Sequence, residues 1–445
     1  MTLLYLVVVA AILAVYLARA VLSFRSAILI GLVFTSFSLP ALPRFLINVS
    51  GANLLLQGVF VILACVFFLA RRRKQDTVPF VCNAYTLGVL AVGLLLLVFI
   101  LFSNAPAYGT VKTAYFVGQS VLPILAVAFL APFTARDLRT IAITIIVGSM
   151  LGALTMLLFG DAGSGATDRA ALGGSSNPIS IARALGFGAT LLLVYLLHTP
   201  MARAFWIPVQ LAAVAVMGWA MITTGSRGPF TAVVLAAGLA VVMTRDRPFG
   251  RLTVLTNVVL VGASIAFVVH DTTWRQDQLG PGFTRISEAY ETLGSNSSDS
   301  GRLLRYRIAL EAYQASNGLG IGTGGFAYVL PPKNEREFPH NIFLEFAVEL
   351  GLLGLAVLVA IIVYLTVQVF VRHDPSNALG KPMVALWLFT LFNACVSGDI
   401  ASNSPFWISG FLLWVSLRVR TAPLTLPRVQ RTRKELHEDR LHHHA

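Results

Sequence analysis

The sequence has few charged residues. Only 12% of its 445 residues are Asp, Glu, Lys or Arg, whereas soluble domains carry about 25%. Hydrophobic residues make up 56% of the chain. A chain of this composition cannot cover itself with polar surface, so a single water-soluble globule is excluded. We expect the lipid bilayer to be its main surroundings.

Cysteine and metal-ligand motifs are also scarce. Cys65, Cys82 and Cys395 lie in or beside apolar runs and have no C-x-x-C spacing. This placement argues against a disulfide framework or a thiolate metal site, so we interpret all three as packing residues. The segments expected to face outward contain no H-E-x-x-H motif, paired histidines or clustered carboxylates. We therefore expect neither a catalytic metal nor another cofactor.

Long polar stretches are rare, and apolar runs dominate the chain. The runs lack the period-2 alternation of barrel strands, and lipid admits only helices or closed barrels, so they predict transmembrane helices. They lie at residues 3–18, 27–42, 52–70, 80–102, 113–133, 138–160, 178–197, 203–223, 228–243, 251–270, 351–371, 383–397 and 405–419.

Acidic residues are outnumbered, with 20 Asp and Glu against 33 Lys and Arg and a formal net charge of +13. The basic residues cluster beside apolar runs, which is the positive-inside pattern of membrane proteins. This pattern indicates cytoplasmic loops and gives no reason to expect nucleic-acid binding. The clusters lie at 71–74, 136–139, 245–251 and 428–434, and the loops at 161–177, 224–228, 271–340 and 398–404 then face outward.

The beginning of the chain fits this topology less well. Two spans before residue 50 would place the N-terminus outside, whereas Arg19 and Arg25 favour an inside loop between those spans. Either thirteen helices cross the membrane or one early segment does not span it. The sequence leaves both possibilities open.

One long polar segment remains, at 271–340, where seven basic residues nearly balance eight acidic residues. An anion site in this segment must therefore come from the placement of individual arginines. Residues 301–315 have helical spacing, and Asn317-Gly318 should end that helix. We expect a transmembrane bundle at 1–270, a loop with short helices at 271–350, the last three transmembrane helices at 351–420 and a basic cytoplasmic tail at 421–445.

Two arginines near the outer surface are candidates for function. An arginine at a helix centre costs roughly 2.5–3.5 kcal/mol on insertion scales, so retention of one suggests a role. Arg227 lies in a tight turn between two spans, and Arg183 lies in the span that starts at Asn177-Pro178. The alternative for each is a side chain that snorkels to the interface or contacts a lipid phosphate. The shape of the turn favours a functional role for Arg227, and both interpretations stay open for Arg183.

Several outward helix starts carry proline at or near the first position. Each start would turn unpaired N–H groups outward, which suits phosphate, although ordinary capping explains any single one. These starts lie at Asn177-Pro178, Gly228-Pro229, Pro339-His340-Asn341 and Asn403-Ser404-Pro405.

Histidine and glycine can be sorted by the same topology. Only His270 and His340 fall on the outer side; His270 ends a span, whereas His340 precedes the amphipathic run 341–349 and is the better candidate for chemistry.

The glycine run 318–325 lacks a preceding strand and a GK[ST] ending, so it predicts a turn-rich linker and not a nucleotide loop.

Four motifs together resemble the O-antigen ligase family. They are Ser226-Arg227-Gly228, residues 300–306, the turn 318–322, and Pro339-His340-Asn341 leading into 349–354. The resemblance covers about residues 50–420. It implies an all-α polytopic membrane protein of the C-type glycosyltransferase kind, with about 12 transmembrane helices and one large helical periplasmic loop. It also implies a location in the bacterial inner membrane, with the active site on the periplasmic side.

The resemblance further implies metal-independent, inverting transfer of a glycan from undecaprenyl diphosphate to a sugar hydroxyl of lipid A–core, in lipopolysaccharide biosynthesis. The donor, the acceptor and membrane lipids would be the partners. The family's functional residues correspond to Arg227, Arg302, His340 and Asp399, with weaker matches at Arg183 and Arg305. The arginines would stabilise the leaving diphosphate and His340 would act as general base. Asp399 would orient His340 or bind the acceptor.

Three alternatives remain. The family also includes O-linked protein oligosaccharyltransferases and is related to O-antigen polymerases; these differ in the acceptor, which the motifs do not specify. An anion or lipid transporter is an alternative of another class. A transporter should line a route through the bilayer with charge and contain matched broken helices, whereas the distinctive polar residues of this chain gather on one side.

Overall fold

The computed structural model describes residues 24–38, 52–70, 78–160, 177–197, 207–243, 297–329, 336–372, 377 and 379–419. All secondary structure in these ranges is helical, which confirms the expected all-α class. The question of the early spans, the run 251–270 with His270, and the basic clusters at 71–74, 245–251 and 428–434 lie outside the described residues.

The helices follow the apolar runs closely. The first half of the described chain contains α2 (Phe24–Phe37), α3 (Ala52–Ala70), α4 (Val78–Val81), α5 (Ala84–Phe99), η3 (Ile100–Phe102), α6 (Pro106–Phe116), η4 (Val117–Val121), α7 (Leu122–Phe129) and α8 (Ala135–Phe159). The second half contains α9 (Pro178–Leu197), α10 (Ile207–Thr223), α11 (Arg227–Met243), α15 (Ser297–Ala315), α16 (Phe326–Val329), α17 (Ile342–Arg372), α18 (Gly380–Val396) and α19 (Ser404–Ser416).

Among the described residues, five helical segments are long and apolar enough to cross a membrane, and shorter apolar helices accompany them. Some helix faces expose apolar side chains at helical spacing, as Val359, Val363 and Val367 do on α17. Such faces suit lipid and not water. The chain is therefore a multi-pass membrane protein, and the total of about 12 spans stays a prediction.

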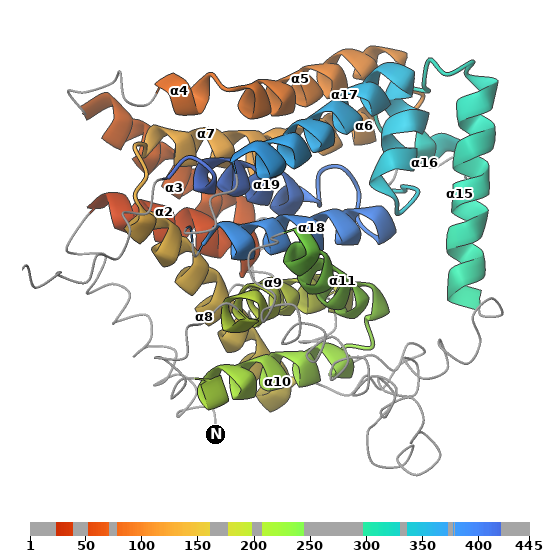
Figure 1. Cartoon of the computed structure of the whole chain (residues 1–445). Coiled ribbons are helices and arrows are strands. Elements are labelled where there is room, and N and C mark those ends of the chain that lie inside the picture. Colours follow the sequence, from red (N-terminus) through yellow and green to blue (C-terminus); the bar gives the residue numbers. More distant parts are fainter. Residues whose placement is uncertain are drawn as a thin grey trace, which may run out of the picture.

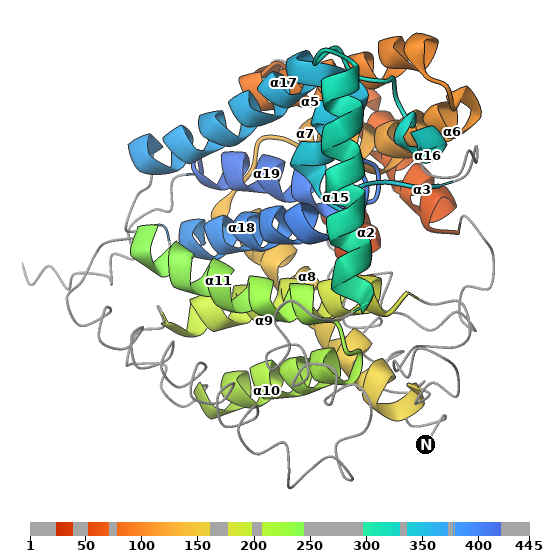
Figure 2. The same ribbon diagram turned by 90° about the vertical axis from the view of Figure 1, so that its right-hand side faces the viewer.

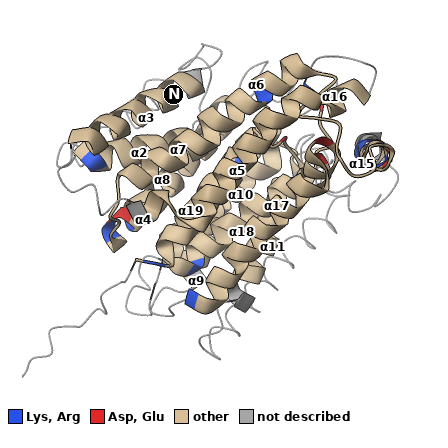
Figure 3. Cartoon of the chain, turned by 90° about the horizontal axis from the view of Figure 1, so that it is seen from above, with Lys and Arg blue, Asp and Glu red and all other residues tan. Residues whose placement is uncertain are grey.

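The apolar helices lie side by side in layers, and α15 stands crosswise at one end of the bundle, next to α16 (Figures 1 and 2). Seen from above, most of the bundle is free of charged residues, whereas α15 carries several (Figure 3). The helix expected at 301–315 is confirmed, and it ends where positive φ angles occur at Asn317 and Gly318. We call α15 and α16 the cap.

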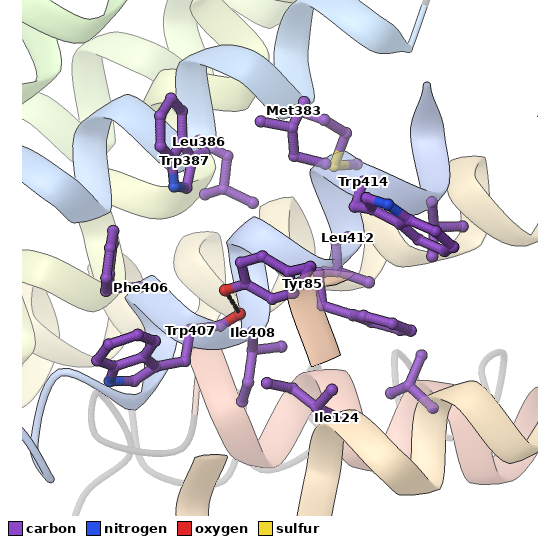
Figure 4. Close-up of a cluster of buried hydrophobic side chains, with 14 of the residues drawn as sticks. Tyr85, Ile124, Met383, Leu386, Trp387, Phe406, Trp407, Ile408, Leu412 and Trp414 are labelled. Carbon is purple, nitrogen blue, oxygen red and sulfur yellow. Dashed lines mark hydrogen bonds between the residues drawn. The ribbon is translucent and has the colours of Figure 1, made fainter. Parts of the chain in front are cut away.

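Aromatic side chains fill the core between α5, α18 and α19. Trp387, Trp407 and Tyr85 are almost fully buried, and the Tyr85 hydroxyl donates to the Trp407 carbonyl (Figure 4). Small residues let these groups approach: a Cβ at Gly410 would lie 2.4 Å from the Tyr85 hydroxyl. Close contact through glycine is how membrane helices pack without a hydrophobic force between them.

The three cysteines are free, as their spacing predicted. Cys65 and Cys395 are partly buried, in keeping with packing roles, whereas Cys82 is exposed. The interpretation of Cys82 as a packing residue was therefore wrong. Cys82 lies in the short connection between α4 and α5, where an apolar neighbourhood in the sequence does not produce burial.

Helix α17 is interrupted at Gly351, whose φ of 64° and ψ of −164° are not helical. The carbonyls of Val348 and Glu349 instead accept hydrogen bonds from the N–H groups of Ile321 and Gly322, at 2.8 and 3.0 Å. The glycine run is thus a turn, as predicted, but it is hydrogen-bonded to α17 and is not a loose linker. These bonds join the cap to the bundle.

Glycine is required in this turn. Gly318, Gly320, Gly322 and Gly324 all have positive φ angles, which favour residues without a Cβ. A Cβ at Gly322 would lie 2.4 Å from the backbone nitrogen of Ser103, and one at Gly320 would lie 2.5 Å from that of Gly351. The turn therefore lies in backbone-to-backbone contact with α17 and with the segment after η3.

Candidate functional site

The predicted site residues lie at the end of the bundle that carries the cap. Helices α9, α11, α17 and α19 begin at this end, and α18 ends there. Two of these starts are capped by asparagine: Asn177 Oδ1 accepts the N–H of Ile179, and Asn341 Oδ1 accepts that of Phe343. The prolines therefore mark helix starts that share one face of the protein.

Asp399 lies in the connection between α18 and α19 and is almost completely buried. Its Oδ1 accepts the Ser402 N–H at 2.6 Å, while Oδ2 accepts the Tyr108 hydroxyl at 3.2 Å and Arg336 Nε at 3.1 Å. Burial acts to raise the pKa of Asp399, but Arg336, Lys112 and the Ser402 bonds outweigh it and lower the pKa. The carboxylate is therefore ionised at neutral pH. The contribution of the ionised Asp399 carboxylate to folding stability is lost only as the pH falls through its lowered pKa.

Arg183 supports the same connection. Its Nη2 donates to the carbonyls of Ser397, at 2.6 Å, and Asn393, at 3.1 Å, at the C-terminus of α18. A cation is favourable there because the last carbonyls of a helix carry the negative end of its dipole; the Asn393 carbonyl also accepts the Ser397 N–H, at 2.9 Å. The Arg183 guanidinium thus faces protein carbonyls, and it also interacts electrostatically with Asp399, Arg302 and Arg336. Its role in substrate binding stays a prediction.

His340 immediately precedes Asn341, whose side chain caps the N-terminus of α17. Its φ of 62° lies in the left-handed region, which is uncommon for any residue except glycine and is often found at functional sites. The Phe338 ring lies against the imidazole, with a centroid distance of 4.4 Å. Nδ1 is buried and finds no hydrogen-bond partner within the described ranges.

The surroundings of His340 keep its imidazole neutral. Burial, followed by the positive charges of Arg302 and Arg305, lowers its pKa from 6.5 to about 4. A neutral imidazole can accept a proton from a hydroxyl group. A bound anion would offset the two arginines and raise this pKa again.

The cap supplies both of these arginines. Arg302, Arg305 and Tyr306 lie on the partly buried face of α15, whereas Arg307 is exposed on the other side and pairs with Glu311. Arg305 pairs with Glu337 at 3.4 Å. On the same helix, Ala309 packs against α16 and α17, which holds this face over the start of α17.

The backbone of Arg227 lies at the same end of the bundle. Arg227 is the first residue of α11, and a Cβ at the next residue, Gly228, would lie 3.2 Å from the Val396 side chain at the end of α18. Arg183 binds carbonyls at that same helix end. The structure thus brings the backbone of Arg227, together with Arg302 and His340, to one end of the bundle.

Several residues at this site were not predicted from the sequence. Arg336 and Tyr108 both bind Asp399. One turn after Tyr108, Lys112 pairs with Glu345 and with Glu349, at 2.6 Å for the latter, and all three side chains are fully buried. We call Lys112, Glu345 and Glu349 the buried ion cluster. The sequence did contain a signal for this cluster: a lysine next to an apolar run, and two glutamates four residues apart in an amphipathic run.

No three His, Cys, Asp or Glu side chains come together as metal ligands would, within the part of the chain that the structure describes. Metal-independent chemistry remains an expectation.

The fold and the site together define a class of protein: a multi-pass helical membrane protein with arginines, one histidine and one aspartate gathered at one end. Residues 212–359 match the family model described as O-antigen ligase. The resemblance indicated by the motifs is confirmed. The matched segment includes Arg227, Arg302 and His340, whereas Arg183 and Asp399 lie outside it. No curated protein matches the chain.

Proposed function

We propose that this protein is an O-antigen ligase that transfers a glycan from undecaprenyl diphosphate to a sugar hydroxyl of lipid A–core. The family domain supports a membrane glycosyltransferase of the ligase or polymerase type. The observation that carries the proposal is a neutral His340 beside Arg302, at the end of the bundle where Arg183 and Asp399 also lie.

These groups suit an inverting displacement without metal. The acceptor oxygen forms a bond to the anomeric carbon while the bond from that carbon to the diphosphate oxygen breaks, and its electron pair stays on the diphosphate. The hydroxyl proton passes to the imidazole of His340, a role that typically contributes 10²–10⁴ in rate. Arg227 and Arg302 stabilise the negative charge that develops on the leaving group.

The distribution of charge supports a periplasmic site at the inner membrane. Basic residues at the opposite helix ends include Arg25 at the start of α2, Arg136 near the start of α8, Arg372 at the end of α17 and Arg418 just after α19. Positive residues favour the cytoplasmic side. The end with His340 would then face the periplasm, where both lipid-anchored substrates meet the protein.

The acceptor distinguishes the proposal from its relatives. Purified protein is incubated with a lipid-linked glycan and, in separate reactions, with core lipid A, a second lipid-linked repeat or an acceptor protein. We expect the glycan on core lipid A, and equal transfer after treatment with a chelator. Transfer only to the lipid-linked repeat or only to protein would identify a polymerase or an oligosaccharyltransferase, and a strict Mg²⁺ requirement would contradict the guanidinium mechanism.

The same assay tests the proposed residues. We expect Arg227→Ala, Arg302→Ala and His340→Ala to abolish transfer while expression and membrane insertion remain normal. Arg307→Ala is the matched control, because Arg307 is an exposed arginine on the opposite side of α15. Near-normal transfer by His340→Ala would remove the general-base assignment.

A further inference from the structure

Arg336 is the exposed partner of a rigid carboxylate. Its side chain is 58% exposed, whereas the Asp399 side chain is only 5% exposed. Asp399 is fixed on its other sides by Tyr108 and Ser402. Within the described ranges, the only hydrogen bond that Arg336 makes is from Nε to Asp399. Among the described residues, the two terminal nitrogens of the guanidinium thus have no hydrogen-bond partner.

Arg336 is also connected to the proposed general base. The Phe338 ring lies 5.3 Å from the Arg336 guanidinium and 4.4 Å from the His340 ring. The Phe338 ring therefore contacts both the guanidinium and the imidazole. Arg336 also interacts electrostatically with Arg183.

The charges around His340 do not balance. Among the described residues, the site holds four arginines, two carboxylates outside the buried ion cluster, and the cluster's one lysine and two glutamates, so it stays net positive even without Arg227. The arginines are Arg183, Arg302, Arg305 and Arg336, and the two carboxylates are Glu337 and Asp399. A diphosphate esterified at both ends carries two negative charges. Uncompensated positive charge near the membrane surface is costly unless an anion binds there.

We propose that Arg336 is a further ligand of the donor's diphosphate, that Asp399 holds Arg336 in place for it, and that Tyr108 is a positioning residue behind that carboxylate. This proposal rests on the proposed function and deepens it. It also gives Asp399 a role different from orienting His340 or binding the acceptor: the carboxylate orients a guanidinium.

The test measures binding and turnover separately. Undecaprenyl diphosphate binding and donor kinetics are determined for the full-length protein in lipid nanodiscs. One charge-assisted contact corresponds to roughly a ten- to hundredfold change in affinity. We therefore expect Arg336→Gln to raise Kd and donor KM by about that factor, while kcat falls much less. Arg336→Lys should recover only part of the loss, because lysine cannot bind Asp399 and phosphate through a planar fork.

A double-mutant cycle tests the role of Asp399. If the carboxylate acts through Arg336, Asp399→Asn combined with Arg336→Gln should raise Kd no more than the larger single effect. Tyr108→Phe removes only the hydroxyl and should raise donor KM by a smaller factor. Fully additive effects of Asp399→Asn and Arg336→Gln would contradict the positioning role.

Arg307→Gln is the control for a lost surface arginine. The proposal is overturned if Arg336→Gln binds undecaprenyl diphosphate as tightly as Arg307→Gln does. A wild-type protein that binds undecaprenyl diphosphate but transfers no glycan would refute the proposed function and leave the result for Arg336 valid. The two failures are therefore distinguishable.

Discussion

His340 shows how single residues acquire their chemistry from the folded structure. The sequence places it after a polar loop and before an amphipathic run, and this made it the favoured histidine. Its neutral state, however, depends on burial and on two arginines from α15, more than thirty residues earlier. The left-handed backbone at His340 adds a local strain that the surrounding contacts must hold.

A pH profile of kcat/KM tests this environment. Because the pKa of His340 is lowered to about 4, the free enzyme should keep a neutral imidazole as the pH falls, until it nears 4. Arg305→Gln removes one of the like charges, so the acid limb should move towards pH 6.5. Profiles measured between pH 4 and 8 check both expectations. An acid limb near pH 6.5 in the wild-type protein would contradict the environment described here.

The profile of kcat gives a second check, since it reports the substrate complex. A bound diphosphate should offset Arg302 and Arg305, so the acid limb of kcat should lie at higher pH than that of kcat/KM.

The lowered pKa of His340 also affects the stability of the folded protein. The unfolded chain takes up a proton on His340 near pH 6.5 and the folded protein only near pH 4, so the free energy of unfolding falls across this interval and stays lower below it.

At the scale of elements, α6 connects the two segments that present the site. Tyr108 holds the connection between α18 and α19, and Lys112, one turn later, holds the first turns of α17. Burying a lysine and two glutamates is costly, and such clusters add little net stability. Their effect is to fix geometry, and this geometry places α17 beneath the cap.

Replacing only the lysine of the buried ion cluster should destabilise the protein more than replacing all three of its charged residues. Lys112→Met leaves two fully buried carboxylates without their cation, which we expect to destabilise the protein by roughly 3–5 kcal/mol. Adding Glu345→Met and Glu349→Met removes the uncompensated charge and should restore much of that loss. Thermal unfolding in detergent compares the two variants. A Lys112→Met protein as stable as the wild type would show that the cluster is not the buried charge centre described here.

At the scale of the whole molecule, the two ends of the bundle differ in character. One end carries the cap, the helix starts and His340, and the other carries Arg25, Arg372 and Arg418. The buried ion cluster lies just inside the first of these ends, and the outer faces of the spans are apolar. The molecule therefore has one chemically distinctive side, in keeping with the proposed transfer at one membrane surface.

Labelling of single cysteines tests the orientation. With Cys65, Cys82 and Cys395 replaced by alanine, Gln314→Cys on the exposed side of α15 should react with a membrane-impermeant maleimide in intact spheroplasts. Arg372→Cys should react only after permeabilisation, because basic residues favour the cytoplasmic face. The reverse labelling pattern would refute a periplasmic site.

Much of the fold was predictable from sequence because the bilayer imposes it locally. Backbone groups in lipid must form hydrogen bonds within their own segment, so an apolar run of sufficient length predicts a helix and its approximate ends. The runs at 52–70, 138–160 and 178–197 therefore match α3, α8 and α9 closely. Motifs in their family order likewise predicted roles for Arg227, Arg302 and His340, and all three lie in the segment that matches the family model.

By itself, then, the sequence determined the helical membrane architecture, the residues 301–315 as a helix, and a family whose motifs carry the proposed chemistry. Only the tertiary structure decided that Asp399 binds Arg336 and Tyr108, and that Lys112 pairs with glutamates of α17. The physical reason is separation along the chain: Tyr108 and Asp399 are 291 residues apart, and Lys112 and Glu349 are 237 apart. Local patterns report on backbone hydrogen bonding and burial of one segment, whereas such pairs form only when packing brings distant helices together.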